Sequence, residues 1–419
     1  MIIINNANSI NGGYTKYLFL IINLFIFGYE SKSSSAQTTE KLKTSNLIKI
    51  IKNVKIEEIP EEFREYEEQG YNRYVGYQAP NGKNIHLLIM NRISDYQIIK
   101  SYNVLSHYLK PNIESPMGGI IQKELIANSM ANNNAILKLV NYRDEPKYND
   151  DLPGQPLFEE EIQVEGGNWY MSQNYEHRDA SYEEILHLVH DYGIGVLNAD
   201  NNIKGALPKF QLELNYYQKL ALRNSWMPPE DIIYEWTSDE NSIDQEYLAS
   251  VIDAYYGLWG ARNEPTESGR SMWGMYKIKT REDFYKKPSI DNSYLLIEKI
   301  FHKYLTYNAY LSDSLKGEFS LKFDPSKPYT NHSRYLKDIT ITGNNYVSVI
   351  VNELDNNITG NGSKTTVIFN GEQNGYNITY NLKNPQKEII VKDIDPSDGD
   401  DGINILNNIN FIAFKDDRS

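Results

Sequence analysis

The stretch ASYEEILHLVHDYG, residues 180–193, carries five side chains able to bind a cation among its apolar residues. They are Glu183, Glu184, His187, His190 and Asp191. In a helix, residues at i, i+4 and i+7 face one side, so Glu183, His187 and His190 form a polar stripe with the other two at its edge. The apolar residues point away from this stripe, into a core. Buried acids and imidazoles grouped in this way are unstable unless they bind a cation or one another.

Residues 183–187, EEILH, match the zinc-protease motif H-E-x-x-H at its Glu and its second His, and differ at the first position. Ligands at i and i+4 reach one ion from the same side of a helix, and the Glu at i+1 reaches the metal-bound water as general base. A carboxylate in the first position also binds zinc, but it makes the site more anionic and raises the pKa of the bound water. The motif therefore predicts a slower enzyme, or a metal other than zinc.

A second helix supplies a candidate third ligand. Glu246 opens the amphipathic segment QEYLASVIDAYYG, 59 residues beyond His187. EEILH followed by EYLASVIDAYYG resembles the zincin metallopeptidases of the lethal-factor-like group, in which H-E-x-x-H precedes a helix beginning E-[FY]-x-A. The upstream segments NIHLLIM and SDYQIIKSYNVLSHYL are similar to the N-terminal lobe of that fold, so the resemblance spans residues 75–260. It implies that Glu184 is the general base and that His187 and Glu246 are zinc ligands. Glu183 then occupies the motif position at which the first histidine ligand is missing.

Other roles for these side chains stay open. His190 could replace Glu183 as a ligand, since i and i+3 also permit shared coordination, although a second His in such a helix more often supports a ligand or lies at the surface. Asp191 most simply belongs to the polar face and orients the imidazole of His187. His177, just before the helix, is a weaker candidate. The alternative to a metal site is a polar stripe stabilised by hydrogen bonds between helices.

The pattern through about residue 310 is that of an α+β domain in which helices dominate. Strands are predicted at residues 85–90 and 135–142, and helices at residues 96–109, 122–130, 207–226 and 242–261. Ser94-Asp95 is the expected cap of the first of these helices, Pro228-Pro229 follows the third, and Gly257 is the expected stop of the fourth.

From about residue 311 the chain consists of short β runs separated by Gly, Asn and Asp. Thr342-Gly343-Asn344 recurs 17 residues later as Thr359-Gly360-Asn361, which suggests stacked rungs of a parallel β-roll or β-helix. The order of features from Gly360 to Asp416 resembles the end of serralysin-type RTX domains.

The calcium-binding pattern of that family is degraded here. Gly360-Asn361-Gly362-Ser363 lacks the Asp that would supply a carboxylate, so the resemblance implies at most weak calcium binding. The acid-rich segment DPSDGDDG, residues 395–402, is better read as a solvated turn than as a calcium site.

Composition narrows the classes of function. A net charge of −14 disfavours sequence-independent binding to nucleic acid or to anionic lipid. The chain has no cysteine, so a metal site must use nitrogen and oxygen ligands, and a cysteine nucleophile is excluded. At 419 residues, the chain is long enough for two folded units.

An apolar run of 12 residues, Tyr17 to Gly28, is too short to cross a bilayer as a helix and suits the core of a secretory signal. An uncleaved N-terminal membrane anchor is the alternative. The expected organisation is a signal peptide (1–36), a linker and N-terminal extension (37–60), a zincin-like domain (61–310) and a β-roll-like domain (311–419).

These observations favour a secreted, metal-dependent hydrolase, with zinc as its metal and a protein or peptide as its substrate. Two alternatives differ in class. One is a catalytically inactive zincin-like protein that uses the scaffold and the β-roll to bind a protein or a surface. The other is an iron enzyme such as an oxygenase, since Glu/His/Glu ligands also suit iron. The sequence does not predict an oligomeric state.

Overall fold

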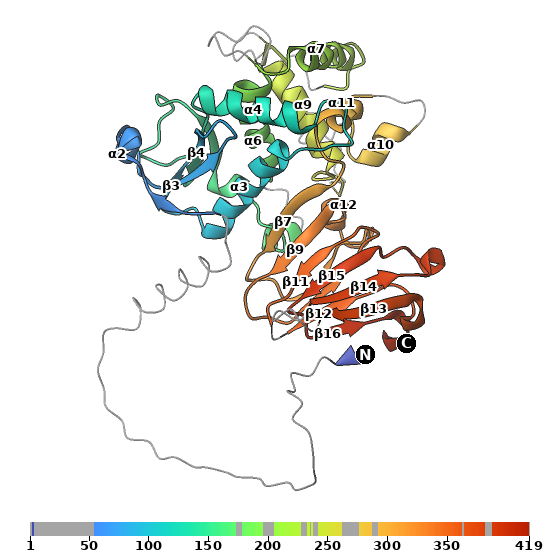
Figure 1. Ribbon diagram of the computed structural model, residues 1–419. Helices are drawn as coiled ribbons and strands as arrows, with labels where there is room; N and C mark the ends of the chain where they lie inside the picture. Colours follow the sequence, from blue (N-terminus) through green and yellow to red (C-terminus); the bar gives the residue numbers. More distant parts are fainter. Residues whose placement is uncertain are drawn as a thin grey trace, which may run out of the picture.

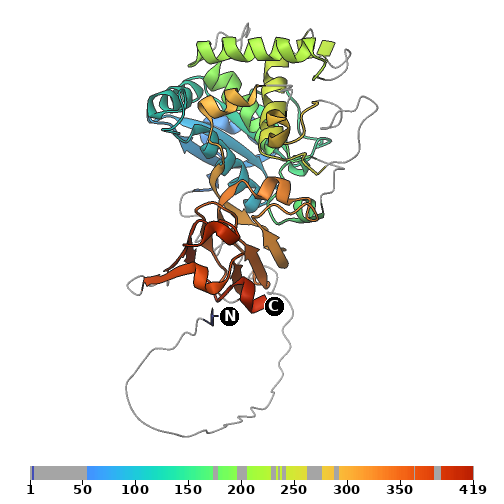
Figure 2. The ribbon, with the colours of Figure 1, turned by 90° about the vertical axis from the view of Figure 1, so that its right-hand side faces the viewer.

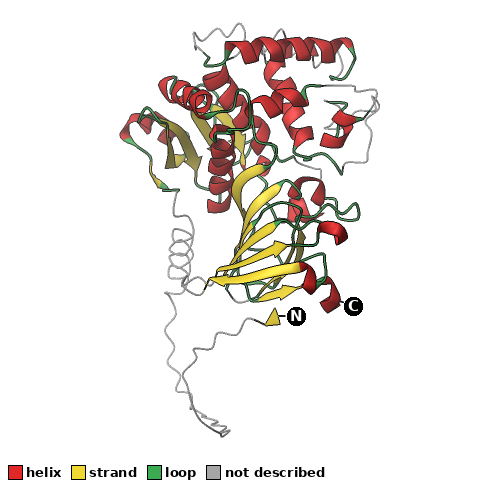
Figure 3. Cartoon of the chain, turned by 45° about the vertical axis from the view of Figure 1, so that its right-hand side comes forward, coloured by secondary structure: helices red, strands yellow, loops and turns green. Residues whose placement is uncertain are grey.

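The computed structural model describes residues 2–3, 54–172, 178–195, 205–227, 233–234, 236–237, 242–261, 276–286, 292–362, 364–381 and 388–418. Helices gather around a mixed sheet in one part of the molecule, and the other part is built almost entirely of strands (Figures 1 and 3). The predicted α+β class is confirmed. The expected signal segment lies outside the described residues, apart from β1 (Ile2–Ile3), and so do His177 and Pro228-Pro229.

The N-terminal sheet has the strand order β2-β3-β4-β5-β6. Its strands are β2 (Glu57–Glu58), β3 (Tyr71–Gln78), β4 (Asn84–Met90), β5 (Ile136–Val140) and β6 (Gln155–Phe158). β3 and β4 are antiparallel, whereas β4, β5 and β6 run parallel. Every residue of β5, and all of β4 after Asn84, is buried, as expected for parallel strands covered on both faces. Both strands predicted from the sequence are confirmed.

The first two predicted helices are also present. α3 (Asp95–Leu109) begins at a capping box, in which the Ser94 hydroxyl accepts from the Gln97 backbone N–H and the Gln97 side-chain oxygen accepts from the Ser94 N–H. This local signal explains why its start could be read from sequence. α4 (Ile120–Asn132) follows and is slightly longer than predicted. Together they carry the chain from β4 to the parallel strand β5.

The central helix of this part is α6 (Ser181–Val189), which packs against α3, against β6 and against α9 (Ile243–Tyr255). Its apolar residues Ile185, Leu186, Leu188 and Val189 are fully buried. The α-helix ends at Val189, and residues His190–Ile194 form a π-helical turn, η3. At Gly193 a Cβ atom would lie 2.7 Å from a side-chain carbon of Ile126, so this turn packs closely on α4.

Two further helices pack against α9. α7 (Pro208–Arg223) lies across the end of the helical part that is remote from the C-terminal sheets (Figure 2). α11 (Tyr294–Ile300) packs on α9 and α7. Gly257, the expected stop of α9, has φ +70° just beyond the end of that helix. No helix in the described part of the chain combines the length and the apolar character needed to cross a membrane.

The remaining helical elements are short. They are η1 (Glu61–Phe63), α2 (Arg64–Glu68), η2 (Glu159–Glu161), α5 (Asn168–Ser172), α10 (Arg281–Tyr285), α12 (Thr330–Ser333), η6 (Gln373–Gly375), η7 (Pro396–Asp398) and η8 (Lys415–Arg418).

The C-terminal part contains two sheets, in the orders β13-β14-β15-β11-β9-β7 and β1-β16-β12-β10-β8. Its strands are β7 (Leu305–Leu311), β8 (Gly317–Ser320), β9 (Leu336–Ile341), β10 (Val347–Ile350), β11 (Asn357–Thr359), β12 (Thr365–Ile368), β13 (Tyr376–Asn381), β14 (Glu388–Asp393), β15 (Ile403–Asn407) and β16 (Phe411–Ala413). From β7 to β12, successive strands alternate between the sheets, and neighbours within each sheet are parallel.

The repeated Thr-Gly-Asn sequences lie in the turns of this alternating chain. The first follows β9 and leads to β10, and the second runs from the end of β11 toward β12. A Cβ atom at Gly343 would come within 2.5 Å of the Asp313 carbonyl oxygen, and one at Gly360 would come equally near that of Asn408. Each glycine therefore allows one turn to stack on the backbone of the next, which is a physical reason for the repeat.

Candidate functional site

Two helices far apart in sequence bring three side chains together. Glu183 and His187 lie on α6, and Glu246 lies in the first turn of α9. Each offers a ligand atom, and these three atoms lie within 4.8 Å of one another. Glu183 is 6% exposed and His187 is 7% exposed, so both are nearly excluded from water. The spacing of the acids and the imidazole along α6 places Glu183 and His187 on the face that meets α9.

His187 has one ring nitrogen near each of two carboxylates. Its Nδ1 lies 3.5 Å from Oε2 of Glu184, and its Nε2 lies 3.8 Å from Oε1 of Glu246. Nε2 is buried and has no hydrogen-bond partner among the described residues. Burial opposes a positive charge on the imidazole, but the surrounding carboxylates, Glu246 first, outweigh burial and raise its pKa to about 10.

Glu246 supplies the carboxylate of α9 in this group. Its removal from water raises its pKa to about 7, although the nearby His187 favours the charged form. The buried imidazole nitrogen of His187 and the carboxylate of Glu246 face each other without a hydrogen bond. A cation between them, either a proton on His187 or a metal ion, stabilises both side chains.

The donor set fits a metal ion. Three nitrogen or oxygen ligands on rigid helices match a catalytic zinc site, which keeps a fourth position open. Zinc ligands at about 2.1 Å in tetrahedral geometry lie roughly 3.4 Å from one another. The present separations, up to 4.8 Å, therefore require a modest contraction of the side chains to close around an ion. The orphaned Nε2 of His187 is the atom that such contraction would satisfy.

Arg178 adds a positive charge that the sequence analysis did not identify. Its Nη1 donates to Oε2 of Glu183 at 2.5 Å, and its Nη2 lies 3.5 Å from Oε1 of Glu184. Burial disfavours the charged guanidinium, but these two carboxylates outweigh it and raise its pKa. Arg178 thus neutralises part of the charge that a metal would otherwise neutralise. An arginine three residues before a helix gave no sequence signal, because its role depends on where the preceding chain lies.

Glu184 is held in the charged form. Gln155, at the start of β6, donates to its Oε2 at 2.7 Å. Burial raises the pKa of Glu184, but His187, Arg178 and Gln155 outweigh burial and lower it. An ionised carboxylate with fixed orientation is the state that a proton acceptor requires. Gln155 was also missed by sequence reasoning, because β6 is brought to α6 only by the tertiary fold.

His190 lies outside the group formed by Glu183, His187 and Glu246. Its Nε2 donates to Oε1 of Gln211 on α7 at 2.6 Å, and the amide nitrogen of Gln211 donates to Asp244 at 2.8 Å. Burial lowers the pKa of His190 to about 4, so this imidazole is neutral at physiological pH. Asp191 is partly exposed in the π-helical turn that His190 begins.

The acid-rich turn of the C-terminal part uses its carboxylates in protein hydrogen bonds. The buried Asp401 accepts from the side-chain amide of Asn370 at 2.6 Å and from the hydroxyl of Tyr376 at 2.7 Å. Asp395 accepts from the backbone N–H of Ser397 at 3.3 Å, the bond of a local turn. Among the described residues, the group of Glu183, His187 and Glu246 is the cluster of acids and histidines compact enough to hold an ion.

Comparisons with models of known protein families, with curated proteins and with solved structures give no match. Function is therefore inferred from the geometry of the site itself.

Proposed function

We propose that this protein is a secreted metal-dependent hydrolase of the zincin type, acting on peptide bonds, with zinc held by Glu183, His187 and Glu246. The observation that carries the proposal is the buried Nε2 of His187, which has no hydrogen-bond partner among the described residues and faces Glu246 at 3.8 Å. A buried polar atom without a partner is rare in folded proteins and calls for an explanation. Bound zinc supplies a Lewis acid and a water molecule of lowered pKa.

In this proposal Glu184 accepts the proton from the attacking water. Its carboxylate is ionised, it lies 3.5 Å from Nδ1 of His187, and Gln155 fixes its orientation from β6. Arg178 withdraws electron density from Glu183 through their hydrogen bond, which makes Glu183 a weaker ligand than the histidine that zinc proteases carry at this position. We therefore expect a loosely held metal and slow turnover.

The C-terminal part fits the proposed β-roll. Strands that alternate between two sheets with parallel neighbours, and turns built on Thr-Gly-Asn, support a stack of rungs. The hydrogen-bonded state of Asp401 supports a tail stabilised by its own side chains, with calcium at most weakly bound.

The second candidate is a catalytically inactive zincin-like binding protein, favoured by Arg178. A guanidinium paired with Glu183 and near Glu184 already provides a counter-charge inside the scaffold. In this alternative the polar face of α6 stabilises the packing of helices, His187 carries a proton, and the molecule binds a protein or a surface.

Metal content decides between these candidates. Full-length protein, Glu184→Ala and His187→Ala are each supplied with zinc or ferrous iron, desalted and analysed by elemental mass spectrometry. The proposal predicts one equivalent of zinc in the unmodified protein and in Glu184→Ala, and none in His187→Ala. Hydrolysis of a quenched peptide library should be lost in Glu184→Ala. Absence of metal from the unmodified protein favours the binding protein, and retention of iron in place of zinc favours the iron enzyme.

A further inference from the structure

A cavity of about 560 Å³ opens at the edge of the N-terminal sheet. Its wall includes Asn91 and Arg92, directly after β4, and Asn141 and Tyr142, directly after β5. β3 begins at the same edge, because Tyr71 pairs with Met90. The cavity therefore lies outside the carboxyl ends of two parallel strands, the position at which ligands bind in open α/β sheets. Its volume falls within the range of small-molecule sites, about 300–1,000 Å³.

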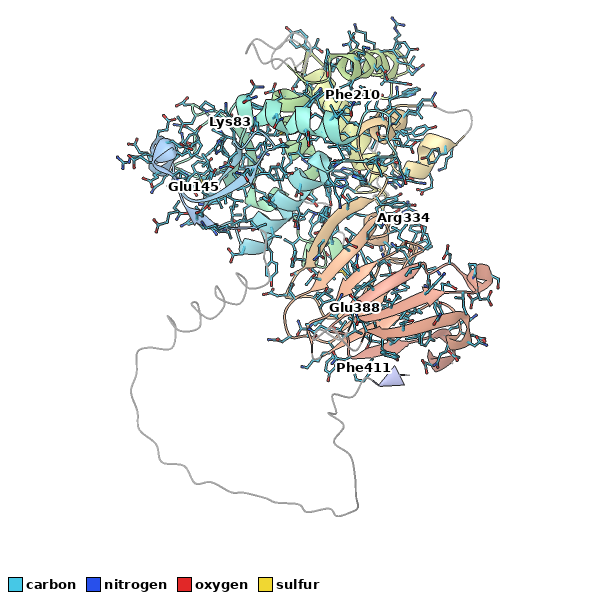
Figure 4. The ribbon with its side chains drawn as sticks, in the orientation of Figure 1. Lys83, Glu145, Phe210, Arg334, Glu388 and Phe411 are labelled. Atoms are coloured by element: carbon cyan, nitrogen blue, oxygen red, sulfur yellow. The ribbon has the colours of Figure 1, made fainter. Side chains whose placement is uncertain are left out.

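This cavity is separate from the proposed metal site. Gln155, which holds Glu184, is the first residue of β6, so the metal site lies toward the amino ends of the parallel strands. None of the three proposed ligands lines the cavity. Glu145, part of its wall, lies at the outer side of the helical part, beside the end that carries α2 (Figure 4). A ligand of this cavity would therefore bind whether or not the protein is a hydrolase.

Side-chain amides and charged groups contribute equally to the wall. Four of its residues carry a primary amide: Gln69, Asn72, Asn91 and Asn141. Each amide offers donors and an acceptor at once. Hydrogen bonds hold two of them in place, since the Asn141 amide nitrogen donates to Asn91 at 3.2 Å and to Glu145 at 2.7 Å. The backbone N–H of Arg92 donates to Asn141 at 2.9 Å, which fixes that side chain between the two strands.

The charges of the wall balance. Glu67 and Glu145 are opposed by Arg92 and Lys147. Arg92 already donates to Glu159 at 2.9 Å, and Glu145 already accepts from Asn141. Neither an anionic nor a cationic ligand is favoured by such a surface, because each meets a side chain of its own sign.

Two buried residues of the wall hold polar atoms with no protein partner. Oε1 of Gln69, a residue 7% exposed, and the hydroxyl of Tyr71, a residue 1% exposed, make no hydrogen bond among the described residues. The wall also contains the ring of Tyr142, over which the Arg92 guanidinium lies at 5.1 Å from the centroid. Both orphaned atoms are shielded from solvent and lie behind the surface of the wall, so the surface that a ligand meets is made by the exposed amides and the ring of Tyr142, which suits a ligand with both polar and apolar faces.

We propose that this cavity binds a saccharide. Sugar hydroxyls both donate and accept, as the exposed amides of Asn72 and Asn91 do, and they carry no charge, which suits the balanced acids and bases. The aliphatic face of a sugar ring matches the half-buried ring of Tyr142. A phosphate would meet Glu67 and Glu145, and a free cation would meet Arg92 and Lys147, so both fit this wall less well.

The test uses the full chain and named sugars. Saturation-transfer NMR followed by titration calorimetry measures glucose, galactose, mannose, N-acetylglucosamine and maltose, with glycylglycine and inorganic phosphate as zwitterionic and anionic probes. The double variant Asn72→Ala/Asn91→Ala removes two exposed amides from the wall. The matched control, Asn132→Ala/Asn374→Ala, removes two exposed amides elsewhere. Thermal melting checks that both variants are folded, and the single variant Asn72→Ala replaces the double variant if the latter is not.

The proposal predicts that at least one of the sugars binds, that the wall variant weakens binding about tenfold or more, and that the control leaves it unchanged. It is overturned if none of the sugars binds, or if both double variants bind a sugar equally well. It is also overturned if glycylglycine or phosphate binds in place of the sugars and is lost in the wall variant, because the ligand would then belong to another chemical class.

Discussion

Nε2 of His187 lies 3.8 Å from Oε1 of Glu246, and although buried it has no hydrogen-bond partner among the described residues. The two residues belong to different helices, α6 and α9, whose packing sets this separation. This separation is too long for a direct hydrogen bond. Burial also makes it unfavourable for a polar group to have no partner. A metal ion in this gap, in place of a proton on His187, is what distinguishes the proposed enzyme from a polar stripe between helices.

Replacing Arg178 tests whether its charge and a metal compete for the same carboxylates. In Arg178→Met, Glu183 and Glu184 lose their internal counter-charge, so the unfolding free energy of the metal-free protein should fall by about 2 kcal/mol. Saturating zinc should recover most of this loss and bind more tightly than in the unmodified protein, because Glu183 is then an unopposed ligand. Urea denaturation with and without zinc measures both effects.

The control for this experiment is Arg64→Met, which removes an arginine paired with Glu61 at the surface, where both side chains are at least 70% exposed. Its stability should change by less than about 0.5 kcal/mol, with or without zinc. If Arg178→Met is destabilised and zinc has no effect, the guanidinium is a structural counter-ion, and the non-catalytic candidate is favoured.

Glu183→His restores the first ligand of the zinc-protease motif. A neutral imidazole donates to zinc without competing for Arg178, so zinc affinity should rise at least about tenfold, and peptide hydrolysis should increase. Glu183→Gln is the matched variant, since it removes the carboxylate and supplies no imidazole. Zinc titration with a competing chelator should show the highest zinc affinity with His at position 183, a lower affinity with Glu and the lowest with Gln. Equal affinities for all three would remove Glu183 from the metal site.

Local patterns account for the part of the site that could be read from sequence. The period of α6 places Glu183 and His187 on one face, and the amphipathic pattern of α9 begins at Glu246. Arg178 and Gln155 could not be read in this way, because they reach Glu183 and Glu184 from a loop and from β6. The stripe also suggested His190 as a ligand. The structure turns it toward Gln211, at the point where the α-helix gives way to a π-helical turn.

The same distinction holds for the fold. The capping box at Ser94 and the apolar run of β4 are local signals, and both elements were predicted with nearly correct bounds. The pairing of β10 with β8 and β12 depends on which strands the intervening turns bring back into register. The sequence indicated such stacking only where Thr-Gly-Asn recurs, because the glycine there meets the backbone of a neighbouring turn.

A buried polar network joins the helical part to the C-terminal strands. Nζ of Lys100 on α3 contacts the carboxylate of Glu165 and donates to the hydroxyl of Tyr182 at 3.1 Å, and Glu165 also accepts from Tyr307 on β7. Lys100→Met should lower the unfolding free energy by about 3–5 kcal/mol, because Glu165 keeps a buried charge without its partner. Urea denaturation followed by both tryptophan fluorescence and circular dichroism measures this loss.

The double variant Lys100→Met/Glu165→Leu completes the cycle. It should be less destabilised than the sum of the two single variants, since neither Lys100 nor Glu165 is left buried without the other, although Asp179, 3.4 Å from Nζ of Lys100, still loses this cation. Because the network spans both parts, a single unfolding transition is expected in the unmodified protein. Additive losses, or two separate transitions, would contradict a shared network.

Calcium removal should leave the C-terminal part unchanged. The carboxylate of Asp401 already accepts from Asn370 and Tyr376, so EDTA should not shift the melting temperature, whereas Asp401→Asn should lower stability by about 1–2 kcal/mol by turning an amide toward those donors. Asp400→Asn is the control, because its exposed side chain accepts only from the nearby Gly402 N–H among the described bonds, and an asparagine keeps that bond. A clear rise in melting temperature with calcium, lost in Asp400→Asn, would reveal a calcium site in this turn.

Lys123 should make stability depend on pH in the alkaline range. Its side chain is 1% exposed, its Nζ donates to the Tyr108 carbonyl oxygen, and it lies 4.5 Å from the centroid of the Phe301 ring. Burial lowers the pKa of this ammonium group from 10.5 to about 7. Between these two values the unfolded chain holds a proton that the folded chain has released, so the contribution of Lys123 to stability rises with pH from about 7 to 10.5.

The size of this effect is on the order of 3 kcal/mol across the window, because each pKa unit corresponds to about 1.4 kcal/mol and partial relaxation around the amine reduces the sum. Lys123→Met removes the titrating group and keeps the buried aliphatic chain, so its stability should lose this rise relative to the unmodified protein. Lys209→Met, at an exposed position on α7, should keep it. Urea denaturation at pH 7 and at pH 9.5 measures how the unfolding free energy changes with pH in the unmodified protein and in the two variants. An undiminished rise in Lys123→Met would mean that the buried amine keeps its proton, shared between the Tyr108 carbonyl and the face of the Phe301 ring.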